Sequence, residues 1–237
     1  MVMIKSVFGK TILDSRKDKT IEVHIKTNAG SFYASAPNGK SKGKKEARSY
    51  KKDIEGDIST LKKFSDYFSA ENIDKFDDLK RIEDILDGNV GADTFVAFEY
   101  AILKALAKEK KKEIWQLINP KARKLPRLLG NCVGGGKHSH SDRKPDFQEF
   151  LLVPKTKSVK KAFELNKKLR EKIKLELKIK DNKFKGEISD ENAWQTQLNE
   201  KQVLDIISDF GVSTGLDIAA SGFYKRKKYN YKNPLLK

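Results

Sequence analysis

The sequence contains a single cysteine, Cys132, among its 237 residues, so an internal disulfide is excluded. A chain with so little cysteine fits a reducing compartment, and we therefore expect a cytoplasmic location. Two interpretations of Cys132 remain open. A small buried packing residue is favoured over a nucleophile, because neither nearby histidine stands in a known Cys-His pattern with it.

Long apolar runs are also absent, since no segment approaches the roughly 20 apolar residues that cross a membrane. Residues 1–5 become polar too early for a secretory signal peptide. We therefore expect no membrane partner. Hydrophobic residues nevertheless make up 38% of the chain, which is enough for a real core and argues against global disorder.

Charge is abundant, and the formal net charge is +17. A nucleic-acid partner is one explanation, which we keep as a secondary hypothesis. The other explanation is a solvated surface, because 33 acidic residues are interleaved with the 50 basic ones and lysine far outnumbers arginine. Surfaces rich in Lys and Glu are also typical of heat-adapted proteins.

The first half of the chain predicts a small antiparallel sheet followed by helices. Strand patterns begin at residue 4, alternate cleanly over 20–27 and return over 31–36 after an Asn-Ala-Gly turn. Looser helical periodicity covers residues 53–86, and a clear apolar stripe at spacings of three and four predicts a helix over 91–110. The basic connector at 121–126 is the predicted domain boundary.

A loop without apolar residues, Pro-Asn-Gly-Lys-Ser-Lys-Gly, occupies residues 37–43. Its simplest interpretation is a mobile surface loop. A lid is the functional alternative, because glycines near each end can absorb the backbone changes of closure. Ser41 lies at its centre.

The second half is organised around residues 134–154, where a glycine turn and two histidines precede the apolar run 150–153. The run predicts a buried strand of the kind found in parallel sheets, which are covered on both faces. Glu149 stands at the start of this strand, where burying a carboxylate without a partner costs free energy. It is therefore either a metal or substrate ligand or a capped structural carboxylate.

Beyond that strand, the pattern predicts a helix over 158–177, a polar segment over 178–197, a helix over 200–210 and an apolar strand over 215–221. The basic, aromatic tail from 225 shows no packing period. Three acids, Glu149, Glu191 and Asp217, fall in strands or in the loop between the helices. In barrels of alternating strands and helices such positions converge, and clustered acids suit Mg²⁺. No Cys/His cluster supports zinc.

Seven segments together resemble the enolase family, the glycolytic 2-phosphoglycerate dehydratases, in order and approximate spacing. They are the Asp-Ser-Arg of 14–16, the strand of 20–25, the loop of 37–43, Gly91-Ala92, the Gly-Gly-Lys-His of 135–138 with the Gln-Glu-Phe of 148–150, the Asp-Glu-Asn-Ala of 190–193 and the Gly-Leu-Asp-Ile-Ala-Ala-Ser of 215–221. Each motif is weak alone, and the combination is specific.

The resemblance implies a mixed α/β and α+β fold. Residues 1–125 would form the enolase-type N-terminal domain, a strand meander with helices and a mobile lid at 37–43. Residues 126–237 would form the first, about three-stranded part of an enolase-type β/α barrel.

By the same resemblance each site residue acquires a role. Asp217 would bind the tightly held Mg²⁺. Ser41 would bind a second Mg²⁺ when the lid closes, and it would also contact the substrate. His138 and Glu149 would contact substrate. Glu191 would be the acid that helps the hydroxyl leave, which is chemistry that a carboxylic acid can perform.

Three departures from the family pattern stand out. His140 fits the usual spacing to Glu149, whereas the glycine context favours His138, which we prefer. Asn192 replaces a glycine of the acid loop, and Gly222 stands where a glutamate is common.

The resemblance also implies that five barrel strands are missing, with two acidic metal ligands, the base lysine, a further histidine and a further lysine. We therefore expect the chain to be inactive alone. We predict a second polypeptide that supplies those strands, so that two chains together dehydrate 2-phosphoglycerate to phosphoenolpyruvate. The alternative is a non-catalytic relative that binds protein or nucleic acid through its basic surface.

Overall fold

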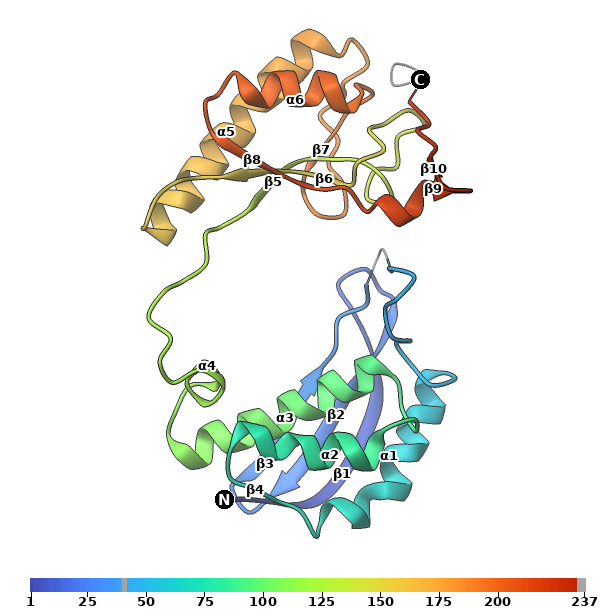
Figure 1. The fold of residues 1–237 in the computed structure, drawn as a ribbon, viewed down its shortest axis with the longest axis vertical. Helices are drawn as coiled ribbons and strands as arrows, with labels where there is room; N and C mark the ends of the chain where they lie inside the picture. Colours follow the sequence, from blue (N-terminus) through green and yellow to red (C-terminus); the bar gives the residue numbers. More distant parts are fainter. Residues whose placement is uncertain (40–41, 234–237) are drawn as a thin grey trace. The chain divides into compact units, whose positions relative to one another are not determined.

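The computed structural model describes residues 1–39 and 42–233, which fall into two compact units. The first unit comprises residues 1–39 and 45–124, and the second comprises residues 42–44 and 125–233 (Figure 1). Lys40 and Ser41 lie outside the described residues, so the central residue of the predicted lid has no structural account. Within the described residues, no helix is long and apolar enough to cross a membrane.

The first unit is a four-stranded antiparallel sheet in the order β3-β2-β1-β4 with helices packed against one face (Figure 1). The predicted strand meander is present as the first three strands. The elements are β1 (Val2–Leu13), β2 (Lys19–Thr27), β3 (Gly30–Ser35), α1 (Ile54–Phe68), β4 (Asn72–Ile73), α2 (Leu79–Leu86), α3 (Ala92–Lys110) and α4 (Ile114–Ile118).

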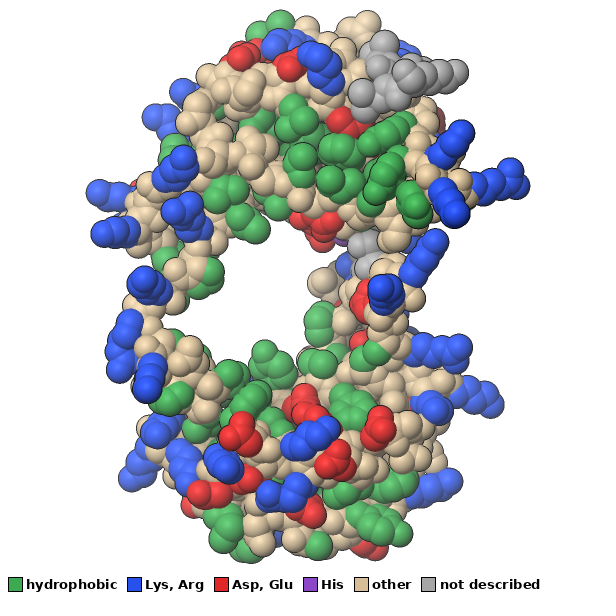
Figure 2. Space-filling view, viewed as in Figure 1, with side chains coloured by type: hydrophobic (Ala, Val, Ile, Leu, Met, Phe, Trp, Pro, Cys, Tyr) green, Lys and Arg blue, Asp and Glu red, His purple; other side chains and the backbone are tan. Residues whose placement is uncertain are grey.

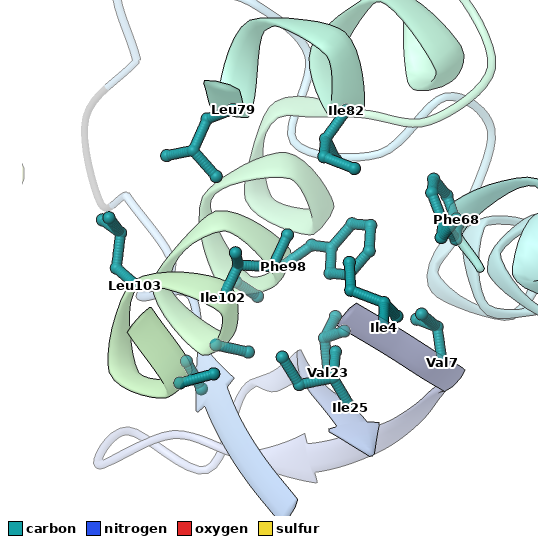
Figure 3. Close-up of a cluster of buried hydrophobic side chains, with 14 of the residues drawn as sticks. Ile4, Val7, Val23, Ile25, Phe68, Leu79, Ile82, Phe98, Ile102 and Leu103 are labelled. Atoms are coloured by element: carbon teal, nitrogen blue, oxygen red, sulfur yellow. The ribbon is translucent and has the colours of Figure 1, made fainter. Parts of the chain in front are cut away.

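A continuous apolar core joins this sheet to its helices. Alternate residues of β2 point inward, as the sequence alternation predicts, and meet the apolar stripe of α3. Figure 3 shows Phe98 of α3 between the strands and Phe68 of α1, with ring centroids 4.8 Å apart in an edge-to-face arrangement. The helix of 91–110 predicted from periodicity is thus the main cover of the sheet.

The second unit contains a sheet in the order β7-β5-β6-β8, with two helices on one face (Figure 1). Strand β7 is parallel to β5, whereas β6 is antiparallel to both β5 and β8. The elements are β5 (Gly130–Gly134), β6 (Glu149–Val153), α5 (Val159–Lys180), β7 (Trp194–Gln195), α6 (Glu200–Ser208), β8 (Ser213–Asp217), β9 (Tyr224–Lys225) and β10 (Lys228–Tyr229). Within residues 125–233 these strands do not close into a barrel.

Three details of the second half differ from the sequence prediction. The apolar run 150–153 is a buried strand as expected, but an antiparallel one, because burial on both faces does not report strand direction. The last strand ends at Asp217 instead of continuing to Ser221, since Ala219 adopts a left-handed backbone and a short 3₁₀ turn follows. The tail is not without packing: it forms the hairpin β9–β10.

Candidate functional site

The antiparallel direction of β6 decides where its carboxylate lies. Glu149 is the first residue of β6, and Asp217, the last residue of β8, is its direct partner in the ladder. Gly134, the last residue of β5, pairs with Glu149 on the other side. The start of β6 and the ends of β5 and β8 therefore lie side by side, at the edge of the sheet where these strands begin or end. The loops that follow β5 and β8 begin there.

A glycine loop after β5 carries His138 to this edge. The backbone N–H of Gly135 donates to the Gln148 carbonyl at 2.9 Å, so the loop folds flat against the start of β6. A Cβ on Gly135 would stand 2.3 Å from the Phe147 carbonyl oxygen, and Gly136 has a φ of +50°. Only glycines fit this path, which explains the Gly-Gly step that precedes the histidine.

His138 is buried and held by an aspartate. Its Nδ1 lies 2.9 Å from Oδ1 of Asp190, and since an ionised carboxylate only accepts, Nδ1–H is the donor. His140 is exposed, and its backbone N–H donates to the side chain of Gln195. The histidine beside the acids is therefore His138.

Glu191 reaches the same place from the loop between α5 and α6. The loop turns at Asn192, whose φ of +61° is a left-handed value that asparagine tolerates better than most residues. The replacement of the family glycine by Asn192 is thus compatible with the turn. Arg170 of α5 fixes the turn, donating to the Asn192 carbonyl at 3.1 Å and lying 3.9 Å from the ring centroid of Trp194.

The resulting cluster joins His138, Glu149 and Glu191, whose ligand atoms all lie within 4.8 Å of one another. His138 Nδ1 is 3.6 Å from Oε1 of Glu191, and Asn131 of β5 donates to Oε2 of Glu191 at 3.2 Å. Asp217 is outside this tightest group, although it is the ladder partner of Glu149. Its two carboxylate oxygens accept from Ala219 N–H and from the Gln148 amide.

Like charges crowd at this edge and change the acidity of Glu149. Burial, then the hydrogen bond and charge of Glu191, and last the charge of Asp217 raise the pKa of Glu149 to about 8. Because its neighbours carry negative charge, Glu149 holds its proton more tightly than an isolated glutamate does. This arrangement can hold a cation or deliver a proton.

Two residues of this site are evident only in the folded structure. Asp190, which belongs to the Asp-Glu-Asn-Ala motif, holds His138, and Asn131 holds Glu191. A polar residue within a buried strand was the available signal for Asn131. For Asp190 there was no signal, because only folding brings it to a histidine 52 positions away.

Cys132 plays no part in this chemistry. Its thiol is buried, donates to the Phe150 carbonyl at 3.1 Å, and has its pKa raised to about 12 by burial. A thiol that stays protonated is a poor nucleophile. This supports the packing interpretation.

Comparison with known proteins gives one consistent result. The family described as the enolase N-terminal domain matches residues 4–118, and the enolase C-terminal TIM barrel domain matches residues 122–235. Among curated relatives, the enolase of Methanosphaera stadtmanae is 30% identical over 251 residues, and that of Methanothermobacter thermautotrophicus is 31% identical over 253. Each alignment covers 97% of this chain and 60% of the relative, so the chain spans about 60% of their length.

Proposed function

Because the chain belongs to the enolase family, we propose that it is the N-terminal subunit of a two-chain enolase and dehydrates 2-phosphoglycerate to phosphoenolpyruvate when a second polypeptide supplies the remaining barrel. The observation that carries this proposal is the meeting of His138, Glu149 and Glu191 within 4.8 Å, with Asp217 opposite Glu149. A protein with only a binding role would not need acidic side chains placed so close together that they repel one another.

The residues at this edge suit Mg²⁺. Carboxylate oxygens of Glu149, Glu191 and Asp217 are hard ligands of the kind that Mg²⁺ prefers. Two further buried oxygens, Oε1 of Gln148 and Oδ1 of Asn131, have no hydrogen-bond partner within the described residues. We propose that Asp217 binds the ion, as its place in the family motif suggests, with Glu149 and Glu191 at the same edge. Bound Mg²⁺ would supply positive charge to stabilise a dianionic enediolate.

The proton chemistry of this chain rests on the Glu149–Glu191 pair. Glu191 is the more exposed acid, and we propose that it gives its proton to the departing hydroxyl, so that water leaves and the double bond forms. His138, oriented by Asp190, and Glu149 would contact the substrate. The base that removes the carbon-bound proton would come from the partner chain, together with the missing acidic ligands.

The outer edge of β8 is where a partner would attach. Strand β8 pairs only with β6 within the described residues, and Leu216 and the following Ile218 are each 38% exposed. An unpaired, partly apolar strand edge favours the addition of another strand. We further propose, from the family relationship, a cytoplasmic and glycolytic role, and a contact of Ser41 with substrate and a second Mg²⁺.

The proposal is tested by capturing the tagged chain from an extract of its source organism and assaying the captured material for Mg²⁺-dependent formation of phosphoenolpyruvate. We expect a second polypeptide with barrel sequences and activity in the same fraction. Glu191→Gln should abolish the activity and leave the pairing intact, since the amide cannot donate an acidic proton. The matched control is Glu164→Gln on the exposed surface of α5, which should change neither.

Other outcomes distinguish the parts of the proposal. Activity that survives Glu191→Gln contradicts the role of Glu191. Recovery of the barrel strands on the same polypeptide contradicts the two-chain arrangement and leaves the acid site standing. An inactive chain captured alone contradicts the catalytic proposal.

A further inference from the structure

The hairpin β9–β10 with its flanks, residues 223–232, contains five cations and no acid, and we call it the basic hairpin. The last acid of the sequence is Asp217, so no Asp or Glu follows it. The cations of the hairpin are all exposed, and none forms an ion pair within the described residues. They are Lys225, Arg226, Lys227, Lys228 and Lys232.

The turn of this hairpin is built from residues that the turn itself disfavours. Arg226 and Lys227 are its two central residues, with φ values of 52° and 64°. Two-residue turns with both central residues left-handed prefer Asn-Gly or Asp-Gly. The two cations therefore stand in strained backbone positions.

The hairpin is held in place in spite of that strain. The Asn230 amide lies within 3.4 Å of three backbone carbonyl oxygens, those of Phe223, Lys225 and Lys228, and donates to them. Phe223 is only 7% exposed and lies against the ring of Phe147, with centroids 6.5 Å apart. The charged turn is thus fixed to the body of the unit and presented as a shaped surface.

The strand that leaves the hairpin is tied down as well. One carboxylate oxygen of Asp146 accepts the backbone N–H groups of Lys232 and Asn233. Burial and then the charge of Lys232 lower the pKa of Lys144, while the nearby Asp142 and Asp146 oppose that shift. The hairpin is therefore anchored at its exit as well as at its base.

Exposed aromatic rings accompany these charges. Tyr229 is 58% exposed, and Tyr224 and Tyr231 are each 37% exposed. The rings of Tyr224 and Tyr229 lie 5.0 Å apart. In Figure 2, blue side chains project from the place that the hairpin occupies in Figure 1, with green side chains beside them. Cationic side chains can bind any polyanion, whereas exposed aromatic rings can also stack on unpaired bases.

We propose that the basic hairpin binds single-stranded nucleic acid. Its five cations contact phosphates, and Tyr229 stacks on a base. This activity is separate from the proposed dehydration, since it uses no residue of the acid cluster. An acidic protein segment is the competing ligand, and it would use the cations without the ring.

The experiment measures binding of the full chain to a fluorescein-labelled 20-nucleotide oligo(dT) by fluorescence anisotropy over a salt series. Arg226→Asn combined with Lys227→Gly removes two charges and gives the turn its preferred residues, so the variant should fold at least as well. We expect about tenfold weaker binding, and a slope of log affinity against log salt that is shallower by about 1.4. Lys167→Gln with Lys168→Gln, two exposed cations of α5, is the matched control and should change neither.

Tyr229→Leu separates the two ligand classes. We expect at least about fivefold weaker oligo(dT) binding, since a stacked base is lost. Binding of a labelled 20-residue polyglutamate should stay unchanged. The proposal is overturned if the control α5 variant weakens oligo(dT) binding as much as the hairpin variant, or if polyglutamate binds more tightly than oligo(dT) and Tyr229→Leu affects neither.

Discussion

One carboxylate in each unit shows two opposite environments, with hydrogen-bond donors around Asp57 and other acids around Glu149. In the first unit Asp57 is 1% exposed, and its oxygens accept from the N–H of Lys51, the N–H of Gly91 and the hydroxyl of Thr94, at 2.7 to 3.1 Å. In the second unit Glu149 faces Glu191 and Asp217. The first arrangement is complete by itself, whereas the second needs a cation or a shared proton. A carboxylate that accepts hydrogen bonds from several donors stabilises the fold. A carboxylate placed beside other carboxylates points to a functional site.

The cores of the units differ in the same sense. Within the described residues, the apolar cluster of the first unit contains 22 buried residues and that of the second contains 12, although the units are similar in length. Less burial gives less stabilisation. The first unit is therefore expected to be the more stable one.

The largest effect is expected from removing the hydrogen-bonded carboxylate of the first unit. Asp57→Ala would leave three donors without a partner and destabilise the first unit by about 3–5 kcal/mol. Urea unfolding followed by fluorescence can resolve the units, because the chain has two tryptophans, Trp115 in the first unit and Trp194 in the second. In single-tryptophan versions, the Trp115 transition should shift and the Trp194 transition should not.

Asp66→Ala on the exposed side of the same helix is the matched control, and it should change the free energy of unfolding by less than about 0.5 kcal/mol. If Asp57→Ala moves both tryptophan transitions together, the units unfold as one and the comparison fails.

A smaller effect on the stability of the second unit is expected when a change of pH alters the protonation of Glu149. The pKa of Glu149 is raised in the folded state, so the folded state holds the proton more tightly. The resulting stability is complete below about pH 4.5 and is lost as the pH rises through about 8. After allowance for solvent screening, we expect a loss of about 1–2 kcal/mol in the Trp194 transition over this range. Glu149→Gln should remove that dependence on pH.

Mg²⁺ provides the control for this prediction. At ten times its dissociation constant it should restore about 1.4 kcal/mol to the Trp194 transition at pH 8. The first unit has a carboxyl pair of its own, in which burial and then Glu83 raise the pKa of Glu99 to about 7, but Lys80 lies 3.5 Å from Glu83. The Trp115 transition should therefore not respond to Mg²⁺. An equal response of both units would contradict a specific site.

The smallest expected effect concerns backbone strain. Lys111 closes α3 with a φ of +53°, a left-handed conformation in which glycine is unstrained. Lys111→Gly should raise the stability of the first unit by about 0.5–1 kcal/mol, read from the Trp115 transition. Lys112→Gly at the next position is the control, and it should bring no gain.

Much of the fold could be predicted from local patterns. The alternation of β2 and the apolar stripe of α3 appear as expected because each element buries one face, and that requirement is written in the spacing of residues. The helix predicted over 158–177 is present as α5, capped by Ser158, but it continues to Lys180. The hairpin β9–β10 was missed because Arg-Lys is not a turn signal, and the two-residue β7 is too short for any period to reveal.

By itself the sequence determined which chemical groups this protein possesses: the glycine turn before His138, the acids Glu149, Glu191 and Asp217, and the family to which they belong. Only the tertiary structure decided which of them meet. Strand direction is set by pairing between distant segments, and the antiparallel course of β6 is what brings Glu149 to the ends of β5 and β8. The choice of His138, and the partners Asp190 and Asn131, follow from that edge, because contacts between remote residues leave no trace in local spacing.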